Sequence, residues 1–336
     1  MANKKVFLYV GNNNLGGMYP SFTDADITRF HADEFVLTVG GYSGYLSSMA
    51  ELTVYMDQLV ALAKRVIELT GKTIWFGFPR PTAPTKTITI SEYSHYADQY
   101  LEIARILHER LDAVGSNYYY NYVQGFYMND EHVRRRNFGT GTGTDDPNGV
   151  NVDVNNLLSH PQIFMYDKVS KGLMTAAHGW KKLLWSPYMG RGGNYDTTMI
   201  DIAYIANTTD IFNTVLLQPG YYFHGDADIQ KNLAVIRNSL NRQEVRRRTN
   251  SGNTDTRVVA KKSSTIIGCQ MEIDELYFKP SAQRTGYQNR YAEYVAAYSG
   301  SKVTSSANRV FSFYCDKKNP YWSETQDKVN AFFDTL

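Results

Sequence analysis

Two apolar stretches of the chain, 123–128 and 266–271, run directly into carboxylates. Burying a carboxylate is costly unless it is paired, hydrogen-bonded or used in a reaction. Two carboxyl groups, one protonated and one ionised, form the arrangement that hydrolyses a glycosidic bond. Alternatively, such acids cap neighbouring helices or hold arginines, and for any single acid both interpretations stay open. The acids that we single out as catalytic candidates are Asp130, Glu131, Glu272 and Asp274.

Stretches with strand character alternate along the chain with segments of helical periodicity. The helical segments carry apolar residues every three or four positions, and two of them stop at Gly71 and Gly115. The predicted strands are 5–11, 34–42, 73–79, 123–131, 182–189, 210–218, 266–275 and 309–315. The predicted helices are 24–33, 47–70, 91–114, 156–178 (restarted at Pro161), 197–206, 226–242, 281–299 and 324–336.

This alternation of strands and helices predicts parallel βαβ units and the α/β fold class. Eight repeats in 336 residues favour a single (β/α)8 barrel, or TIM barrel, as one domain over residues 1–336. We expect a long loop at about 132–155, between the fourth strand and its helix. An open doubly wound sheet fits less well, because residues 11–17 after the first strand lack the G-x-G-x-x-G fingerprint.

In a (β/α)8 barrel the active site lies at the carboxyl ends of the strands. The fourth and seventh strands lie across the barrel mouth from each other, so their acids are expected to face one pocket. Side chains alternate along a strand. We therefore expect Glu272 and Asp274 to share a face, with Gln270 below them, and only one of Asp130 and Glu131 to enter the mouth.

Two basic clusters fall at opposite ends of the predicted barrel. The three arginines at 134–136 follow the fourth strand, on the active-site side, where one of them could reach an anionic group. The basic connection 246–262 precedes the seventh strand and is predicted to be a solvated loop on the other side.

Aromatic residues gather where the predicted strands end. The chain has 26 Tyr, 16 Phe and 4 Trp, and a tyrosine offers an apolar face with a polar tip, which suits a wet binding cleft. Each ring alone is more often a packing residue, and their concentration on one rim is what suggests sugar binding. The substrate-binding candidates are Tyr42, Arg80, Tyr127, Trp185, Tyr188, Gln218, Tyr221, Tyr222 and Tyr314.

Several classes of protein fit the composition poorly. A net charge of +2 makes no case for nucleic acid, and no apolar run reaches membrane-spanning length. Two Cys exclude a disulfide framework, and neither H-E-x-x-H nor a Cys/His cluster occurs, so we expect no metal and no cofactor. The first residues run into a strand without a signal-peptide pattern, which leaves open a protein kept inside the cell or one whose leader has been removed.

Four motifs occur in order at 125–131, 185–189, 218–223 and 271–274: G-F-Y followed by Glu, W-S-P-Y-M, Q-P-G-Y-Y-F and M-E-I-D. Together they resemble the bacterial barrel family called domain of unknown function 4855, which is grouped with glycoside-hydrolase-like barrels. The resemblance spans nearly the whole chain. It implies an acid/base at Glu131, a partner carboxylate at Glu272 and a supporting Asp274. The chain departs from the family pattern at Met128, Gly220 and Asp274, which leaves the substrate open.

These observations predict a barrel glycosidase that uses two carboxylates on a carbohydrate substrate. In this hypothesis Glu131 is the general acid, its pKa raised by burial or by repulsion from its partner, and Glu272 is the nucleophile or base. A non-catalytic carbohydrate-binding barrel is the first alternative. A barrel enzyme for a phosphorylated metabolite is the second, and it would bind an anion after the seventh and eighth strands.

Overall fold

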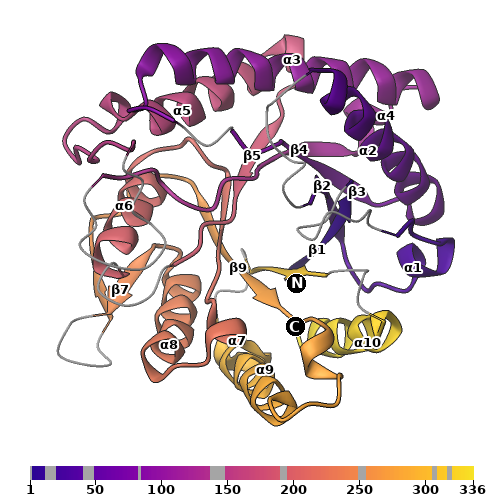
Figure 1. Cartoon of the computed structure of the whole chain (residues 1–336), viewed down its shortest axis with the longest axis vertical. Helices are drawn as coiled ribbons and strands as arrows, with labels where there is room; N and C mark the ends of the chain where they lie inside the picture. The colour runs from indigo at the N-terminus through magenta and orange to yellow at the C-terminus, as the bar shows by residue number, and fades with distance from the viewer. Residues whose placement is uncertain are drawn as a thin grey trace.

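The computed structural model describes residues 2–11, 20–40, 49–81, 85–136, 148–189, 195–248, 255–304, 309–315 and 320–336. Eight parallel strands close into a barrel in the order β1-β10-β9-β6-β5-β4-β3-β2 (Figure 1). The barrel strands are β1 (Asn3–Val10), β2 (Glu34–Val39), β3 (Thr73–Gly77), β4 (Val123–Met128), β5 (Lys182–Trp185), β6 (Thr214–Leu217), β9 (Ile266–Glu272) and β10 (Val310–Tyr314). The predicted single (β/α)8 barrel is confirmed.

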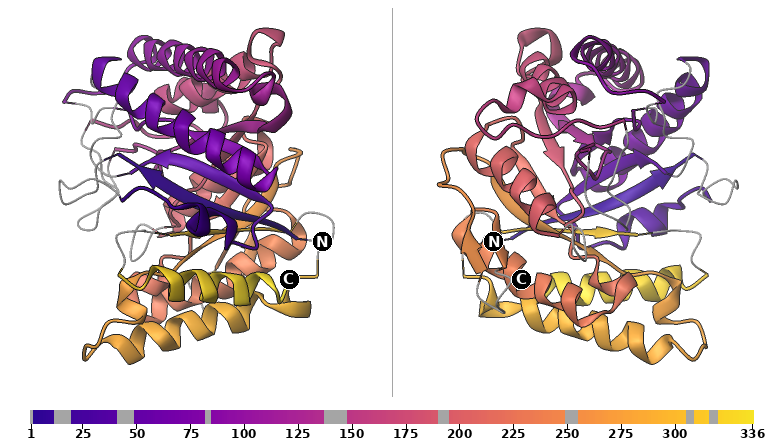
Figure 2. Two further views of the ribbon diagram at one scale, coloured as in Figure 1. Left: turned by 90° about the vertical axis from the view of Figure 1, so that its right-hand side faces the viewer. Right: turned by 60° about the vertical axis from the view of Figure 1, so that its left-hand side comes forward.

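Helices surround the barrel, with α3 and α5 on one side and α9 and α10 on the opposite side (Figures 1 and 2). The helices are α1 (Asp24–Thr28), α2 (Met49–Thr70), α3 (Ile90–Val114), α4 (Tyr118–Tyr122), α5 (Pro161–Leu173), α6 (Tyr195–Thr208), α7 (Tyr221–His224), α8 (Ala227–Arg242), α9 (Arg284–Tyr298) and α10 (Trp322–Phe333). The short helices α4 and α7 were not predicted. Among the described residues, no helix is long and apolar enough to cross a bilayer.

Local signals set where several helices begin. Thr89 caps α3 by accepting from the Glu92 N–H, and Asp226 caps α8 by accepting from two backbone N–H groups. Pro161 is the first residue of α5, as predicted, because a proline lacks only an N–H that the first turn would leave unpaired. The predicted helix 156–178 is therefore three pieces: a 3-10 turn at Leu157–Ser159, then α5, then a second 3-10 turn at Ala176–His178.

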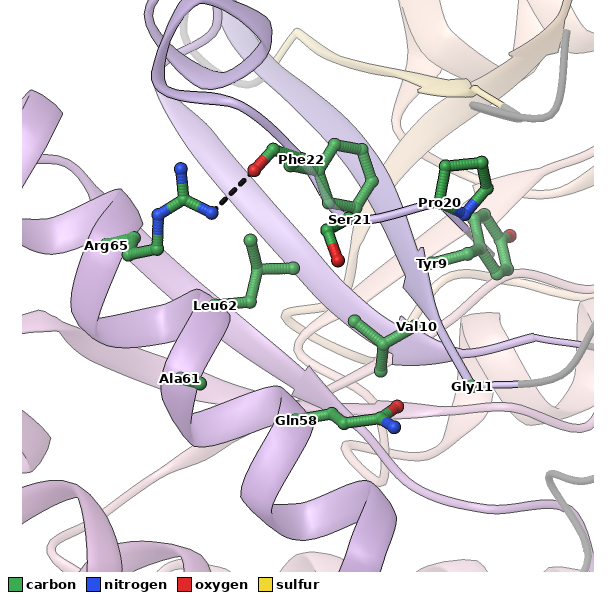
Figure 3. A pocket seen from close by; sticks show the side chains of 10 residues that line it. All are labelled: Tyr9, Val10, Gly11, Pro20, Ser21, Phe22, Gln58, Ala61, Leu62 and Arg65. Carbon is green, nitrogen blue, oxygen red and sulfur yellow. Dashed lines mark hydrogen bonds between the residues drawn. The ribbon is translucent and has the colours of Figure 1, made fainter. Parts of the chain in front are cut away.

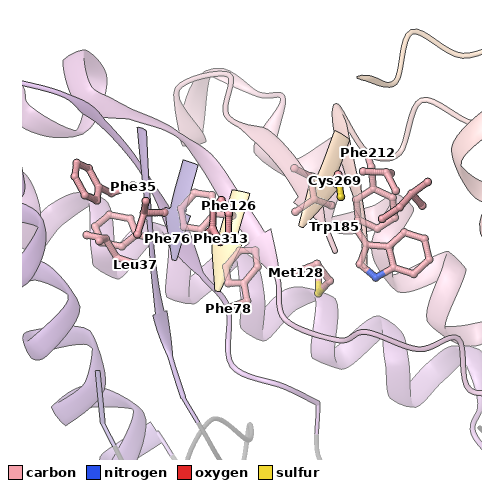
Figure 4. Close-up of a cluster of buried hydrophobic side chains, with 14 of the residues drawn as sticks. Phe35, Leu37, Phe76, Phe78, Phe126, Met128, Trp185, Phe212, Cys269 and Phe313 are labelled. Carbon is pink, nitrogen blue, oxygen red and sulfur yellow. The ribbon is translucent and has the colours of Figure 1, made fainter. Parts of the chain in front are cut away.

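The apolar side chains form two layers, because successive residues of a strand point to opposite sides of the sheet. One layer fills the space between the strands and the helices and contains Phe126, Met128, Trp185 and Phe212 (Figure 4). The other fills the barrel interior. Its buried members are Phe7, Val36, Trp75, Tyr127, Leu184, Leu216 and Val310. Burial on both faces explains why the strands read as continuous apolar runs.

The connection before β9 is not the solvated basic loop that the sequence suggested. It contains a two-stranded antiparallel sheet of β7 (Arg246–Arg248) and β8 (Asp255–Arg257). Arg246 donates to the carboxylates of Glu244 at 2.6 Å and Asp255 at 2.7 Å, and Arg257 contacts Glu244 at 2.8 Å. The buried Glu244 and the partly buried Asp255 thus hold two of its arginines in place, a pairing that the sequence did not reveal.

Candidate active site

A pocket of about 260 Å³ opens at the carboxyl ends of the barrel strands. It contains two of the predicted catalytic acids, Glu131 after β4 and Glu272 at the end of β9, so the two strand ends face one cavity as expected. The residues that line it are Tyr9, Glu131, Tyr188, Gln218, Gly220, Phe223, His224, Gln270, Glu272 and Tyr314.

Glu272 is the buried carboxyl of the pair, with 5% of the residue exposed. The Tyr294 hydroxyl donates a hydrogen bond to its Oε2 atom, and the Gly220 N–H donates a second hydrogen bond. Burial raises the pKa of Glu272 to about 7, and the charge of Glu131 adds to this, while the two hydrogen bonds oppose it. Glu272 can therefore both hold and release a proton near neutral pH.

Tyr294 reaches Glu272 from α9, the helix that follows β9. Its hydroxyl oxygen accepts from the Tyr222 N–H at 3.0 Å while its proton points to Glu272. The ring is fully buried, so the hydroxyl is held in one place. Tyr294 was not predicted, because nothing in a tyrosine-rich helix indicates which ring meets the barrel.

Glu131 lies in a more open and more positive environment. Its side chain is 32% exposed, and the Arg80 Nη2 atom lies 3.7 Å from its Oε1 atom. Arg80 also donates from Nε to Asn129 at 3.4 Å, which aims the guanidinium at the end of β4. Burial, one of the two causes expected to act on Glu131, falls on Glu272 instead.

Asp130 points away from the pocket, which confirms that only one of the two acids after β4 enters the mouth. The alternation of β4 continues past its end: Tyr127 faces the barrel interior and Met128 faces the helices. The Asp130 Oδ2 atom accepts from Gln162 of α5 at 2.8 Å. Burial raises the pKa of Asp130, and the nearby Arg134 opposes this. Its role is to join the strand end to α5.

Asp274 does not share the pocket with Glu272 either, and that expectation is wrong. Strand β9 ends at Glu272, so the alternation that would have placed Asp274 in the mouth stops there. The Asp274 carboxylate instead accepts from the Leu276 N–H at 2.9 Å and from the Tyr222 hydroxyl at 2.8 Å. It caps a 3-10 turn at Glu275–Tyr277.

Three of the predicted rim residues line the pocket: Tyr188, Gln218 and Tyr314. Arg80 adjoins it through Glu131. Tyr42 lies outside the described residues. Four further candidates are buried and are not among the residues that line the pocket. These are Tyr127, Trp185, Tyr221 and Tyr222.

The local backbone explains why each of these four rings is buried in a core layer. Tyr127 is inside the barrel, edge-on to Phe7 at 5.1 Å. Trp185 follows the inward-facing Leu184 and so points outward, where it is 0% exposed and stacks on Phe212. Tyr221 and Tyr222 belong to the turn of α7, which directs both rings into the layer between sheet and helices.

Five lining residues were absent from the predicted site. Gln270 was expected below Glu272 but was given no binding role, and Tyr9 could have been found from the inward face of its strand. Tyr9 meets Tyr314 with ring centroids 4.9 Å apart. Gly220, Phe223 and His224 depend on the unpredicted turn of α7. Gly220 has φ +67°, and a Cβ there would lie 2.4 Å from the Tyr188 ring, so only glycine fits.

A chain of polar groups crosses the pocket floor beside Glu272. Gln218 donates from Nε2 to the Ser186 carbonyl at 2.6 Å, and the Ser186 hydroxyl donates to Gln270 Oε1. These bonds fix the two glutamines, which come from β9 and from the end of β6. Their remaining polar atoms are suited to the hydroxyl groups of a ligand.

The arginines after β4 are engaged by the protein. Arg135 donates to Asp201 of α6 at 2.8 Å, and Arg134 lies 4.0 Å from Asp130. Burial raises the pKa of Asp201 to about 6, and Arg135 opposes this. In the part of the chain that the structure describes, no group of three His, Cys, Asp or Glu side chains is arranged to hold a metal ion.

A neighbouring pocket of about 220 Å³ lies outside the barrel, between α2 and residues 20–22 (Figure 3). Its lining is mainly apolar, and Arg65 donates to the Phe22 carbonyl at 2.5 Å at its edge. No carboxylate is among its lining residues. Of these two pockets, the one in the barrel mouth is the one that contains both candidate carboxylates.

The unusual proton affinity of Glu272 predicts a stability effect. The folded state favours the protonated acid, so the contribution of Glu272 to stability falls as the pH rises from about 4.5 through 7. Glu272→Gln removes the cost of burying the charge and is expected to be more stable than wild type at pH 8, by about 1–3 kcal/mol. The gain should disappear near pH 4.5. Urea unfolding at both pH values measures it.

Glu131→Gln is the matched control for that experiment, because its side chain is a third exposed. It should show no comparable gain at pH 8. A Glu272→Gln variant that is less stable than wild type at pH 8 would contradict the assigned environment of this acid.

No family model and no curated protein match the chain. The structure is similar to solved glycoside hydrolase barrels. With a glycoside hydrolase family 5 enzyme from Prevotella bryantii B14 it shares 10% identity at a TM-score of 0.51, covering 94% of this chain and 87% of that one. With a GH5 enzyme from Streptomyces cattleya in complex with Manβ1-4GlcNAc it shares 11% identity at a TM-score of 0.52, covering 97% of this chain and 79% of that one.

A broad-specificity GH5 endoglucanase from Clostridium longisporum gives 10% identity and a TM-score of 0.52, with 94% and 87% of the two chains covered. At such identities the likeness shows the fold alone. The chain thus has the (β/α)8 barrel fold that these enzymes also have. Its resemblance to the domain of unknown function 4855 stays a prediction.

Proposed function

We propose that this protein hydrolyses a glycosidic bond in an oligo- or polysaccharide. The observation that carries the proposal is that Glu131 and Glu272, from strand ends four and seven of the barrel, line one pocket together. The hydrolysis needs one carboxyl that protonates the departing oxygen and one carboxylate that acts as nucleophile or as base for water. The likeness to glycoside hydrolase barrels supports the proposal at the level of the fold.

The two environments suggest how the roles divide. A carboxyl whose pKa is raised by burial is suited to donate a proton, and one in a polar, partly solvated place stays ionised. Glu272, with its pKa raised to about 7, is the proton donor in this assignment. Glu131, beside Arg80, is the nucleophile or base. This order is the reverse of the one that the sequence resemblance implies.

The other lining residues supply binding groups. The faces of Tyr9, Tyr188 and Tyr314 can stack on the C–H side of a sugar ring, and Gln218 and Gln270 can bond its hydroxyls. Both glutamines are held by Ser186, so little rotamer entropy remains to be lost on binding.

The test is incubation of the wild-type protein with a panel of defined β- and α-linked oligosaccharides, followed by separation of the products. Release of shorter sugars from at least one linkage is expected. Calorimetric binding of a sugar without any release would replace this proposal with the alternative, a non-catalytic carbohydrate-binding barrel. Absence of both binding and release across the panel would remove the carbohydrate assignment.

A further inference from the structure

We propose that the amino-terminal mouth of the barrel, opposite the Glu131–Glu272 pocket, is a second binding site, which takes a small oxyanion such as phosphate or a carboxylate. A cavity of about 280 Å³ lies there. Every barrel strand contributes to its lining. The lining residues are Asn3, Lys5, Glu34, Trp75, Gln124, Lys182, Asn213, Thr214, Ser264, Ile266, Arg309 and Val310.

The location follows from the strand starts. In the left view of Figure 2, β1 begins near the chain's N-terminus and runs toward the far end of the barrel. Asn3, Glu34 and Lys182 are the first residues of β1, β2 and β5. The interior apolar cluster, with Phe7, Tyr127 and Leu184, lies farther along the same strands. It separates this cavity from the Glu131–Glu272 pocket, so the inference does not depend on the proposed function.

The one carboxylate in the cavity is already neutralised. Lys5 forms an ion pair with Glu34, and the Trp75 indole N–H donates to the same carboxylate. Asn3 donates from Nδ2 to the other oxygen at 2.7 Å. Lys5 is only 3% exposed, so this pair is a fixed part of the wall. The positive charge of Lys182, which also lines the cavity, is not neutralised by this pair.

The cavity is also rich in hydrogen-bond donors. Within the described residues, the Lys182 ammonium has no ion pair and the Gln124 amide has no hydrogen-bond partner. Asn213 uses its Oδ1 atom to accept from the Leu183 N–H at 2.8 Å, which leaves its Nδ2 donors for the cavity. The charge of Lys182 repels that of Lys5. An anion bound between the two would be attracted to both and would offset this repulsion.

These properties select an oxyanion over other ligands. A cation would be repelled by Lys182. An apolar molecule would leave the ammonium and the amide donors buried without hydrogen-bond partners. An oxyanion accepts from ammonium and amide donors at once, and its bond to the ammonium is charge-assisted. The cavity has room for a ligand of the size of phosphate or a small carboxylate.

The test compares the melting temperature in sodium phosphate and in sodium acetate with that in sodium chloride at matched ionic strength. Phosphate, acetate or both are expected to raise the Tm of wild type by about 2–5 °C, since a ligand that binds only the folded state stabilises it. The Lys182→Met variant should lose the rise. Lys182 is exposed, so this variant should fold.

The matched control is Lys86→Met, which removes the same charge from an exposed site outside the cavity. It should keep the wild-type rise, and this controls for the general stabilisation that phosphate gives by exclusion from protein surfaces. An equal rise in Lys182→Met, or no rise in wild type with either anion, would overturn the proposal.

Discussion

Replacing either Glu131 or Glu272 by glutamine is expected to lower kcat/KM on a natural oligosaccharide by about 10³-fold. Both acids line the pocket, and in the proposed mechanism each supplies a step that an amide cannot perform. The measurement is the initial rate of product release at the pH optimum. Because glutamine has the same shape as glutamate, sugar binding should persist, and KM should change much less than kcat.

Changing the leaving group of the substrate distinguishes the proton donor from the nucleophile or base. An aryl glycoside with an acidic phenol departs without a proton, so Glu272→Gln should recover much of its activity on such a substrate. Glu131→Gln should stay inactive on both substrates, because the attack on the sugar is missing. Recovery by Glu131→Gln instead would assign the proton to Glu131, as the sequence resemblance implies. Full activity of either variant on the natural substrate would remove that acid from the mechanism.

Asp130→Asn is a matched control for both variants. Its carboxyl faces Gln162 of α5 and is not among the groups that line the pocket. We expect it to retain most of the activity, because the asparagine oxygen can still accept from Gln162 and the change lies outside the pocket. A 10³-fold loss of activity in this variant at full stability would show that the wrong acid of the pair after β4 has been placed in the mouth.

Trp185→Ala is expected to destabilise the protein by about 3–5 kcal/mol, the usual cost of deleting a large buried ring. The side chain is 0% exposed, stacks on Phe212 with centroids 5.1 Å apart, and donates from Nε1 to the Asp130 carbonyl at 2.6 Å. Equilibrium unfolding in guanidinium chloride measures the loss. A substrate-binding tryptophan on the rim would instead cost little stability and much affinity.

Two further variants make this test specific. Trp185→Phe keeps most of the packing and loses the hydrogen bond, so it should cost about 1–3 kcal/mol. Trp180→Ala removes a ring that is 65% exposed and should change stability by about 0.5 kcal/mol or less. If Trp185→Ala cost no more than Trp180→Ala, the ring would not be the packing element that we assign.

The barrel could be predicted because its signal is repeated eight times. Each strand is buried on both faces, so each appears as an apolar run, and each is followed by a segment with helical periodicity. The same pattern also predicted where the site lies, because the acids follow the carboxyl ends of the fourth and seventh barrel strands, β4 and β9. Glu131 and Glu272 were therefore brought to one pocket by information that the sequence alone contains.

The rim was harder to predict, because a ring beside a strand end has two possible directions. Tyr188 and Tyr314 face the pocket, whereas Trp185 faces the helices. One residue of shift in the end of a strand reverses this choice. The predicted fifth strand extended to residue 189, but β5 ends at Trp185, with an inward-facing Leu184 setting the outward direction of the indole.

By itself, the sequence determined the fold class, the barrel and the pair of strand ends that carry the acids, because these depend on periodicity, which is local. Only the tertiary structure decided which acid of each pair enters the mouth and which is buried. Strand β9 stops at Glu272 and leaves Asp274 to cap a turn. Tyr294 arrives from α9 to cover and hydrogen-bond Glu272. Burial and hydrogen bonding depend on neighbours far apart in sequence, and these neighbours set the pKa that makes Glu272 a proton donor in our assignment.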